Sequence, residues 1–148
     1  YRYVTGVQTC ALPIWQRYPG KAILYSADLN KDFAWAVFMA GGSLAGIPKV
    51  SERGMLVCAA SMRQVDVPGA PAGQWTLGNN RGEFIVYCRA SGDLKLDLNA
   101  AAGPLTAYWI NPRDGSLLGK QSLAKGAQST ELRCPTSGPV VLWVAQAD

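Results

Sequence analysis

The stretch LKLDL at residues 94–98 decides the fold class of this chain. Its three leucines alternate with Lys95 and Asp97, which is the period of two expected of a β-strand that buries one face. Residues 84–89, FIVYCR, are expected to alternate between two faces, with Phe84, Val86 and Cys88 on one and Ile85, Tyr87 and Arg89 on the other. We therefore expect strands whose apolar side chains face a core and whose charged side chains face solvent.

Four further segments have the composition of strands, and turn residues separate them. They are residues 105–110, 116–123, 129–133 and 140–145. Short strands spaced by roughly 8–12 residues, with no helix between them, are typical of an antiparallel sandwich. The sequence predicts a mainly β fold class, an antiparallel β-sandwich of six to seven strands. Residues 140–145 are apolar on both faces, so we expect a central strand that is covered on each side.

The region before these strands has helical patterns. Residues 31–40 are apolar nearly all round, which predicts a helix with protein on most sides, ended by Gly41. We expect Ser51 to cap a second helix, and the apolar residues on one face of that helix are Met55, Leu56, Ala59 and Met62. A short buried strand is expected at residues 22–26, and the Pro- and Gly-rich residues 65–73 are expected to form a linker.

The first fourteen residues have no helical or strand period. Residues 4–14, VTGVQTCALPI, resemble the translation of a sequencing adapter that contaminates metagenomic assemblies. We interpret residues 1–14 as a non-native segment; the alternative is an ordinary N-terminal strand and turn ended by Pro13. The native polypeptide is then expected to begin near Trp15, with a part of the protein missing upstream.

Composition excludes several classes of protein. Apolar residues make up 49% and charged residues 16% of the chain, which is unlike a disordered protein. The net charge of +4 comes from scattered basic residues, whereas nucleic-acid-binding domains carry a basic stripe. The apolar runs are far shorter than the roughly 20 residues of a membrane-spanning helix. We expect no nucleic acid partner and no membrane span.

The residues that usually carry out catalysis are scarce. The chain has no histidine, which removes the commonest general base, the commonest zinc ligand and every Ser-His or Cys-His nucleophile. Its carboxylates fall on expected turns, outward strand positions and helix ends, and no pair stands out for glycoside hydrolysis. We predict no catalytic residue, no metal site and no cofactor in this chain.

Three cysteines lie outside the first fourteen residues. They are Cys58, Cys88 and Cys134, and their spacing matches no metal-binding or redox motif. Cys88 and Cys134 both fall in the expected sheet, which is compatible with one disulfide. The alternative, which we favour at this point, is that they are buried as small apolar side chains.

Aromatic residues are the better candidates for binding. Tyr108 and Trp109 are neighbours in an expected strand, so they point to opposite faces. Trp109 shares its face with Leu105 and Ala107, which assigns Trp109 to the core and Tyr108 to the more exposed face. An exposed ring can stack on a sugar, so Tyr108 and Trp75 are the candidate ligand-binding residues. Burial in the core is the alternative for both.

Three segments carry a resemblance to a known family. They are residues 34–44 (AWAVFMAGGSL), 108–115 (YWINPRDG) and 135–143 (PTSGPVVLW). They resemble the C-terminal end of bacterial glycoside-hydrolase-like proteins, in which a TIM barrel precedes a small β-sandwich labelled a collagen-binding domain. Asn111 stands where that family more often has Asp. The resemblance implies that residues 15–66 are the end of a barrel and residues 67–148 the sandwich.

The resemblance also implies a function. The chain is expected to be a non-catalytic accessory sandwich of a secreted or periplasmic glycoside hydrolase, which braces its own missing TIM barrel and contacts polysaccharide. An independent carbohydrate- or matrix-protein-binding module is the alternative, and a complete small enzyme is disfavoured. The family's catalytic carboxylates lie on barrel strands that are absent here. Large exposure of Trp35 and Phe38 would indicate that this helix has lost its native neighbours.

Overall fold

The computed structural model describes residues 34–41, 46–90, 92–99, 101–123 and 129–147. The chain forms two compact units, Tyr1–Ile47 and Pro48–Asp148. The segment interpreted as non-native and the expected strand at residues 22–26 lie outside the described residues. Within the described ranges, no helix is long and apolar enough to cross a membrane.

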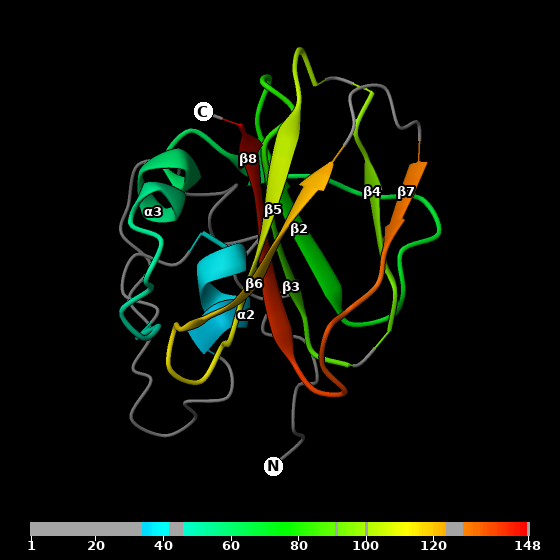
Figure 1. The fold of residues 1–148 in the computed structure, drawn as a ribbon. Helices are drawn as coiled ribbons and strands as arrows, with labels where there is room; N and C mark the ends of the chain where they lie inside the picture. The colour runs from blue at the N-terminus through cyan, green and yellow to red at the C-terminus, as the bar shows by residue number, and fades with distance from the viewer. Residues whose placement is uncertain (1–33, 42–45, 91, 100, 124–128, 148) are drawn as a thin grey trace, which may run out of the picture. The chain divides into compact units, whose positions relative to one another are not determined.

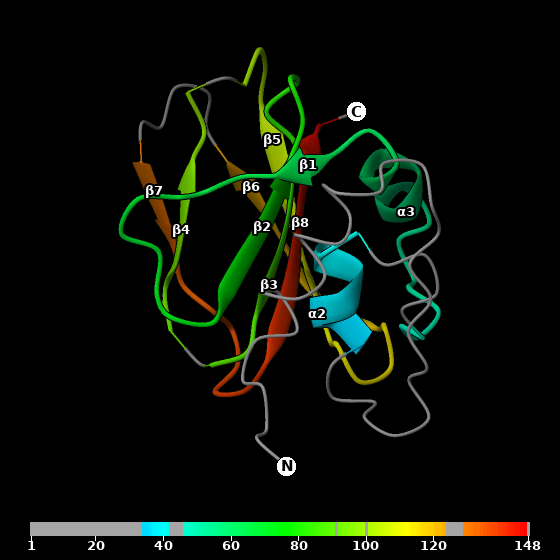
Figure 2. The ribbon, with the colours of Figure 1, turned by 180° about the vertical axis from the view of Figure 1, so that it is seen from behind.

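The second unit is built from two antiparallel sheets (Figures 1 and 2). The larger sheet has the strand order β1-β2-β3-β8-β5-β6, and the smaller sheet pairs β4 with β7. The strands are β1 (Arg63–Gln64), β2 (Gln74–Gly78), β3 (Phe84–Cys88), β4 (Leu94–Asp97), β5 (Leu105–Ile110), β6 (Leu117–Leu123), β7 (Ser129–Leu132) and β8 (Val140–Gln146). Both views show β4 and β7 facing one side of the larger sheet, which makes the second unit a sandwich. The predicted mainly β, antiparallel fold class is confirmed.

The core lies between these two layers. Leu94, Leu96 and Leu98 are at most 1% exposed, whereas Asp97 is exposed to solvent, as the alternation predicts. The core cluster also includes the inward-facing residues of the larger sheet, namely Phe84, Val86, Cys88, Leu105, Ala107, Trp109, Leu123, Val140, Leu142 and Val144. The assignment of Trp109 to the core is therefore confirmed.

Strand β8 occupies the centre of the larger sheet. It pairs with β3 on one side and with β5 on the other. All of its residues from Val140 to Ala145 are buried, and only Gln146 is exposed. The prediction of a central strand covered on both faces is confirmed.

Two strands of the larger sheet were not predicted. β1 has only two residues, and β2 (QWTLG) follows directly on the Pro- and Gly-rich segment. The sequence of β2 has one aromatic and one β-branched residue among five, which is a weak strand signal. Pairing with β3 along its whole length forms this strand, and such long-range pairing is invisible in a local pattern.

The second helix differs from its prediction. α3 spans Gly54–Ala59, and Arg53 stands at its N-cap without a side-chain hydrogen bond. Ser51 does not cap it: the Ser51 hydroxyl donates to the Gly115 carbonyl oxygen instead, at 3.2 Å. Met55 and Met62 are buried, but Leu56 is 44% exposed. A helix of only six residues is too short to present the expected apolar face.

The first helix is buried rather than exposed. α2 spans Ala34–Met39, and Gly41 follows it with φ 81°, the left-handed conformation expected after a helix end. Trp35 is 3% exposed and packs edge-on against Phe38, with ring centroids 5.7 Å apart; Phe38 is itself half-buried. Neither ring is largely exposed, so the sign that this helix has lost its native neighbours is not observed.

The boundary between the compact units lies at Ile47/Pro48, before the boundary expected at residues 66/67. Two contacts explain the difference. Arg63 of β1 pairs with Gly78 of β2, and a Cβ at Gly54 of α3 would lie 2.9 Å from the Trp143 ring. Residues 48–66 thus pack with the sandwich. The assignment of residues 15–66 to a barrel remains a prediction.

Candidate functional site

Three neighbouring strands place Lys120, Tyr108 and Trp143 in one row on the face of the larger sheet opposite the core. Tyr108 of β5 is the register partner of Lys120 in β6 and of Trp143 in β8. The Tyr108 and Trp143 rings stack with centroids 4.7 Å apart, and the Lys120 Nζ lies 4.8 Å from the Tyr108 centroid. Lys120 and Trp143 thus contact the half-buried Tyr108 ring from the two neighbouring strands. We call these three residues the aromatic row.

Residues next to α3 complete the aromatic row. Lys120 Nζ lies 4.0 Å from the Glu52 Oε1 atom, and Gly54 is close enough to Trp143 that a side chain there would meet the indole. Trp143 is 8% exposed. Its Nε1–H is the one buried side-chain polar atom without a hydrogen-bond partner in the part of the chain that the structure describes. A buried donor of this kind costs about 1–3 kcal/mol.

The candidate residue Trp75 belongs to a second aromatic pair. Trp75 of β2 is the register partner of Tyr87 in β3, and the two rings stack with centroids 5.3 Å apart and planes 12° apart. Trp75 is half-buried, whereas Tyr87 is 4% exposed.

The structure does not bring Trp75 and Tyr108 together. Two strands, β3 and β8, separate β2 from β5 in the sheet, and three strand spacings amount to about 14 Å. The two predicted ligand-binding residues therefore belong to separate aromatic groups. One sugar ring cannot contact both.

Residues 111–116 form the turn between β5 and β6, and they include the end of the motif, Asn111 to Gly115. The Asn111 Oδ1 accepts the Arg113 N–H at 3.0 Å, and the Asp114 Oδ1 accepts both the N–H and the hydroxyl of Ser116, at 2.9 and 2.7 Å. Asn111 thus acts as the hydrogen-bond acceptor at the start of the turn. An aspartate would accept this hydrogen bond equally well. These hydrogen bonds show that the motif residues Asn111 and Asp114 stabilise the turn.

Gly115 in this turn touches another part of the chain. Its φ is 75°, and a Cβ would overlap the Lys49 carbonyl oxygen. The Gly115 carbonyl oxygen accepts the N–H of Ser51 at 3.0 Å as well as the Ser51 hydroxyl. The turn therefore holds residues 49–51, which lead into α3, against the sheet.

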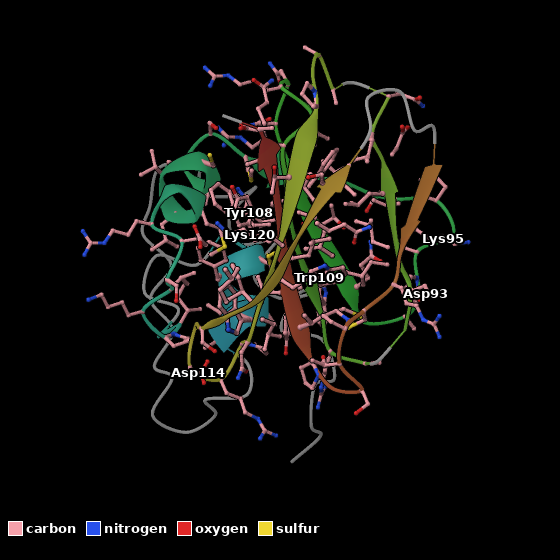
Figure 3. The ribbon with its side chains drawn as sticks, viewed as in Figure 1. Asp93, Lys95, Tyr108, Trp109, Asp114 and Lys120 are labelled. Carbon is pink, nitrogen blue, oxygen red and sulfur yellow. The ribbon has the colours of Figure 1, made fainter. Side chains whose placement is uncertain are left out.

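Three of the described carboxylates accept hydrogen bonds from residues close to them in the sequence. Glu83, which is 8% exposed, accepts the Asn79 Nδ2–H at 2.7 Å, and Asp97 accepts the Asn99 N–H at 3.0 Å. The Ser116 hydroxyl and N–H hold the pKa of Asp114 below its usual range. Figure 3 shows Asp114 at the turn, apart from Tyr108 and Lys120.

Among the described residues, no three His, Cys, Asp or Glu side chains are grouped so that they could hold a metal ion.

Three residues of this site were not expected from the sequence. Lys120 lies next to Tyr108, Glu52 next to Lys120, and Gly54 next to Trp143. The turn pairs Ile110 with Leu117, but a register shift between Trp109 and Ile110 places Lys120 opposite Tyr108 where regular pairing would place Gly119. Counting along the hairpin would therefore have missed Lys120. No local pattern links α3 to Trp143, which is 89 positions further along the sequence than Gly54.

Comparison with known proteins finds similarity over part of the chain. Residues 7–62 match the family described as "Domain of unknown function (DUF6298)", which is less than half of the chain. The match begins inside the segment interpreted as non-native and ends before β1. A search of the curated proteins finds no match.

Two solved structures have detectable similarity. One is titled a glycoside hydrolase family 5 protein from Bacteroides vulgatus (15% identity, TM-score 0.46, 59% of this chain and 21% of that chain). Another is titled "Glycoside hydrolase" (15% identity, TM-score 0.41, 60% and 20%). This chain thus spans about a fifth of the length of either protein. Neither similarity is close enough to transfer an activity to this chain.

Proposed function

We propose that this chain is a non-catalytic accessory β-sandwich of a secreted or periplasmic glycoside-hydrolase-like protein, in which it braces the catalytic barrel. The turn at residues 108–115, which carries the sequence resemblance, is the observation on which the proposal depends. Its Trp109 lies in the core, its Asn111 and Asp114 shape the turn, and its Gly115 holds the segment before α3. A motif used in this way supports a structural role.

The chemistry of the described residues supports the same role. Three carboxylates, Glu83, Asp97 and Asp114, accept hydrogen bonds from residues within four positions of them in the sequence. The Tyr108 ring is in contact with Trp143 and with the Lys120 ammonium. Acid–base hydrolysis of a glycoside needs two carboxyl groups facing one sugar, whereas the hydrogen bonds of these three carboxylates are made within their own segments.

Exposed apolar side chains support contact with a further domain. Leu56 and Val57 of α3 are 44% and 77% exposed, and Leu118 of β6 is 41% exposed. In this proposal, Leu56 and Val57, which are neighbours in α3, belong to the surface that the barrel covers. The partner in this proposal is the barrel of the same protein.

Two measurements test the proposal. The gene upstream of this chain is expected to encode a TIM barrel with two carboxylates at its strand ends. The full chain alone is expected to hydrolyse aryl glycosides no faster than buffer. Turnover that is lost on substitution of a single carboxylate in this chain would contradict the non-catalytic role.

A second candidate function is an independent glycan-binding module. The partial exposure of Trp75, with one ring face stacked on Tyr87, favours it. The test is titration of the full chain against a panel of polysaccharides. Saturable binding that Trp75→Ala or Tyr108→Ala abolishes, and that the exposed α3 control Leu56→Ala retains, would establish the module in place of the brace.

The variant Lys120→Ala separates the two aromatic groups. It removes the ammonium from one face of Tyr108 and leaves Trp75 and Tyr87 unchanged. If Tyr108 is a sugar platform, Lys120→Ala should change the affinity several-fold. If Trp75 alone binds, the affinity should stay the same.

A further inference from the structure

Two cysteines from different layers of the sandwich reach one core. Cys88 is the last residue of β3 in the larger sheet and is 1% exposed. Cys134 follows β7 of the smaller sheet by two residues, and its partly buried side chain packs against the core cluster to which Cys88 belongs. The third described cysteine, Cys58, lies in α3.

The path of the chain supports their proximity. Leu132 points into the core, and Cys134 lies two residues further on, so an extended chain turns both side chains the same way. Residues 135–139 then lead directly to Val140, which is the register partner of Cys88. The segment that begins at Cys134 therefore ends beside Cys88.

Both thiols are free in the structure, and each lies within hydrogen-bonding distance of a nearby oxygen atom. The Cys88 Sγ–H donates to the Ala90 carbonyl oxygen at 3.0 Å, and the Cys134 Sγ lies 3.6 Å from the Thr136 Oγ1. Burial raises the pKa of the Cys88 thiol, and the charge of a Cys134 thiolate raises it further.

We propose that Cys88 and Cys134 form a disulfide that joins the two layers of the sandwich when the folded protein meets a low-molecular-weight disulfide. The more accessible Cys134 thiolate attacks that disulfide, forms a mixed disulfide and releases one thiol. Cys88 then loses its proton to water and attacks the Cys134 Sγ, which releases the second thiol. Two protein thiols lose two electrons and two protons, and the small disulfide gains them. This proposal does not depend on the proposed function.

The experiment uses the full chain with Cys10→Ser and Cys58→Ser, so that only the two cysteines of interest remain. The folded protein is treated with oxidised glutathione under non-denaturing conditions. We expect both thiols to disappear without retained glutathione. Trypsin should release residues 82–89 linked to residues 134–148, because the sequence is cleavable after Arg81, Arg89 and Arg133.

The link closes a loop of more than forty residues, so the oxidised protein should melt about 5–15 °C above the reduced protein. The control Cys134→Ser, in the same background, should show no such rise. The raised pKa of Cys88 predicts that closure of the mixed disulfide accelerates as the pH is increased. Glutathione retained on Cys134, disulfide-linked dimers, or linkage only in denaturant would each overturn the proposal.

Discussion

Single residues in the β5–β6 turn connect the motif to the packing of the sandwich. Gly115 combines a positive φ with a backbone contact to Lys49, and Asp114 receives two hydrogen bonds from Ser116. Gly115→Ala and Ser116→Ala therefore test the two kinds of contact in the turn, close backbone packing and side-chain hydrogen bonding.

Gly115→Ala should destabilise the protein by about 2–4 kcal/mol, because a non-glycine residue is strained at this φ and its Cβ would push the Lys49 backbone away. Denaturant unfolding followed by tryptophan fluorescence measures the change. Gly119→Ala is the matched control, since a Cβ there meets nothing within 4 Å. Equal effects of the two variants would show that the close approach is unimportant.

The Asp114 carboxyl should titrate below the usual pKa of an aspartate, because the Ser116 N–H and hydroxyl stabilise its charged form. Ser116→Ala should raise this pKa towards the ordinary value. Since the folded pKa is lowered, the contribution of Asp114 to stability is present above the unfolded pKa and is lost as the pH falls through the folded pKa. NMR titration of the carboxyl carbon measures both pKa values, and an unchanged pKa in the variant would contradict the assigned cause.

At the scale of elements, one side chain joins the two sheets. The Gln74 Nε2–H donates to the Lys95 carbonyl oxygen at 2.8 Å, and the Gln74 Oε1 accepts the Lys95 N–H at 3.2 Å. Gln74 in β2 thus pairs with the backbone of β4 as a neighbouring strand would. The edge of the smaller sheet is thereby covered on this side, which limits pairing with other chains.

Gln74→Ala should cost about 1–3 kcal/mol, because it leaves both backbone groups of Lys95 without this partner. Hydrogen exchange at the Lys95 amide should accelerate in the variant. Gln121→Ala, at an exposed position of β6, should change the stability by less than about 0.5 kcal/mol. Unaltered exchange at Lys95 would mean that Gln74 does not hold β4.

At the scale of the whole molecule, the compact unit Pro48–Asp148 is larger than the sandwich predicted from residue 67 onward. A fragment of residues 48–148 should unfold cooperatively. A fragment of residues 67–148 lacks α3, β1 and the partner of Gly115, and it should melt at a lower temperature or bind a hydrophobic dye. Calorimetry of both fragments decides between the boundaries, and equal melting temperatures would favour the boundary at residue 67.

The sequence by itself determined most of the strands. Residues 94–98 alternate between a buried and a more exposed face, whereas β3 is apolar throughout and is buried on both faces. The sequence also placed Trp109 in the core and Gly41 after a helix. It identified Tyr108 as one candidate ring, but not the side chains that cover it.

Only the tertiary structure decided which elements meet. Ser51 binds Gly115 instead of capping α3, Lys120 and Trp143 enclose Tyr108, and β2 exists because β3 pairs with it. Each of these contacts joins residues whose partners lie in another segment of the chain. Local periodicity reports how one segment divides its side chains between two faces, and it carries no information about which distant segment will cover them.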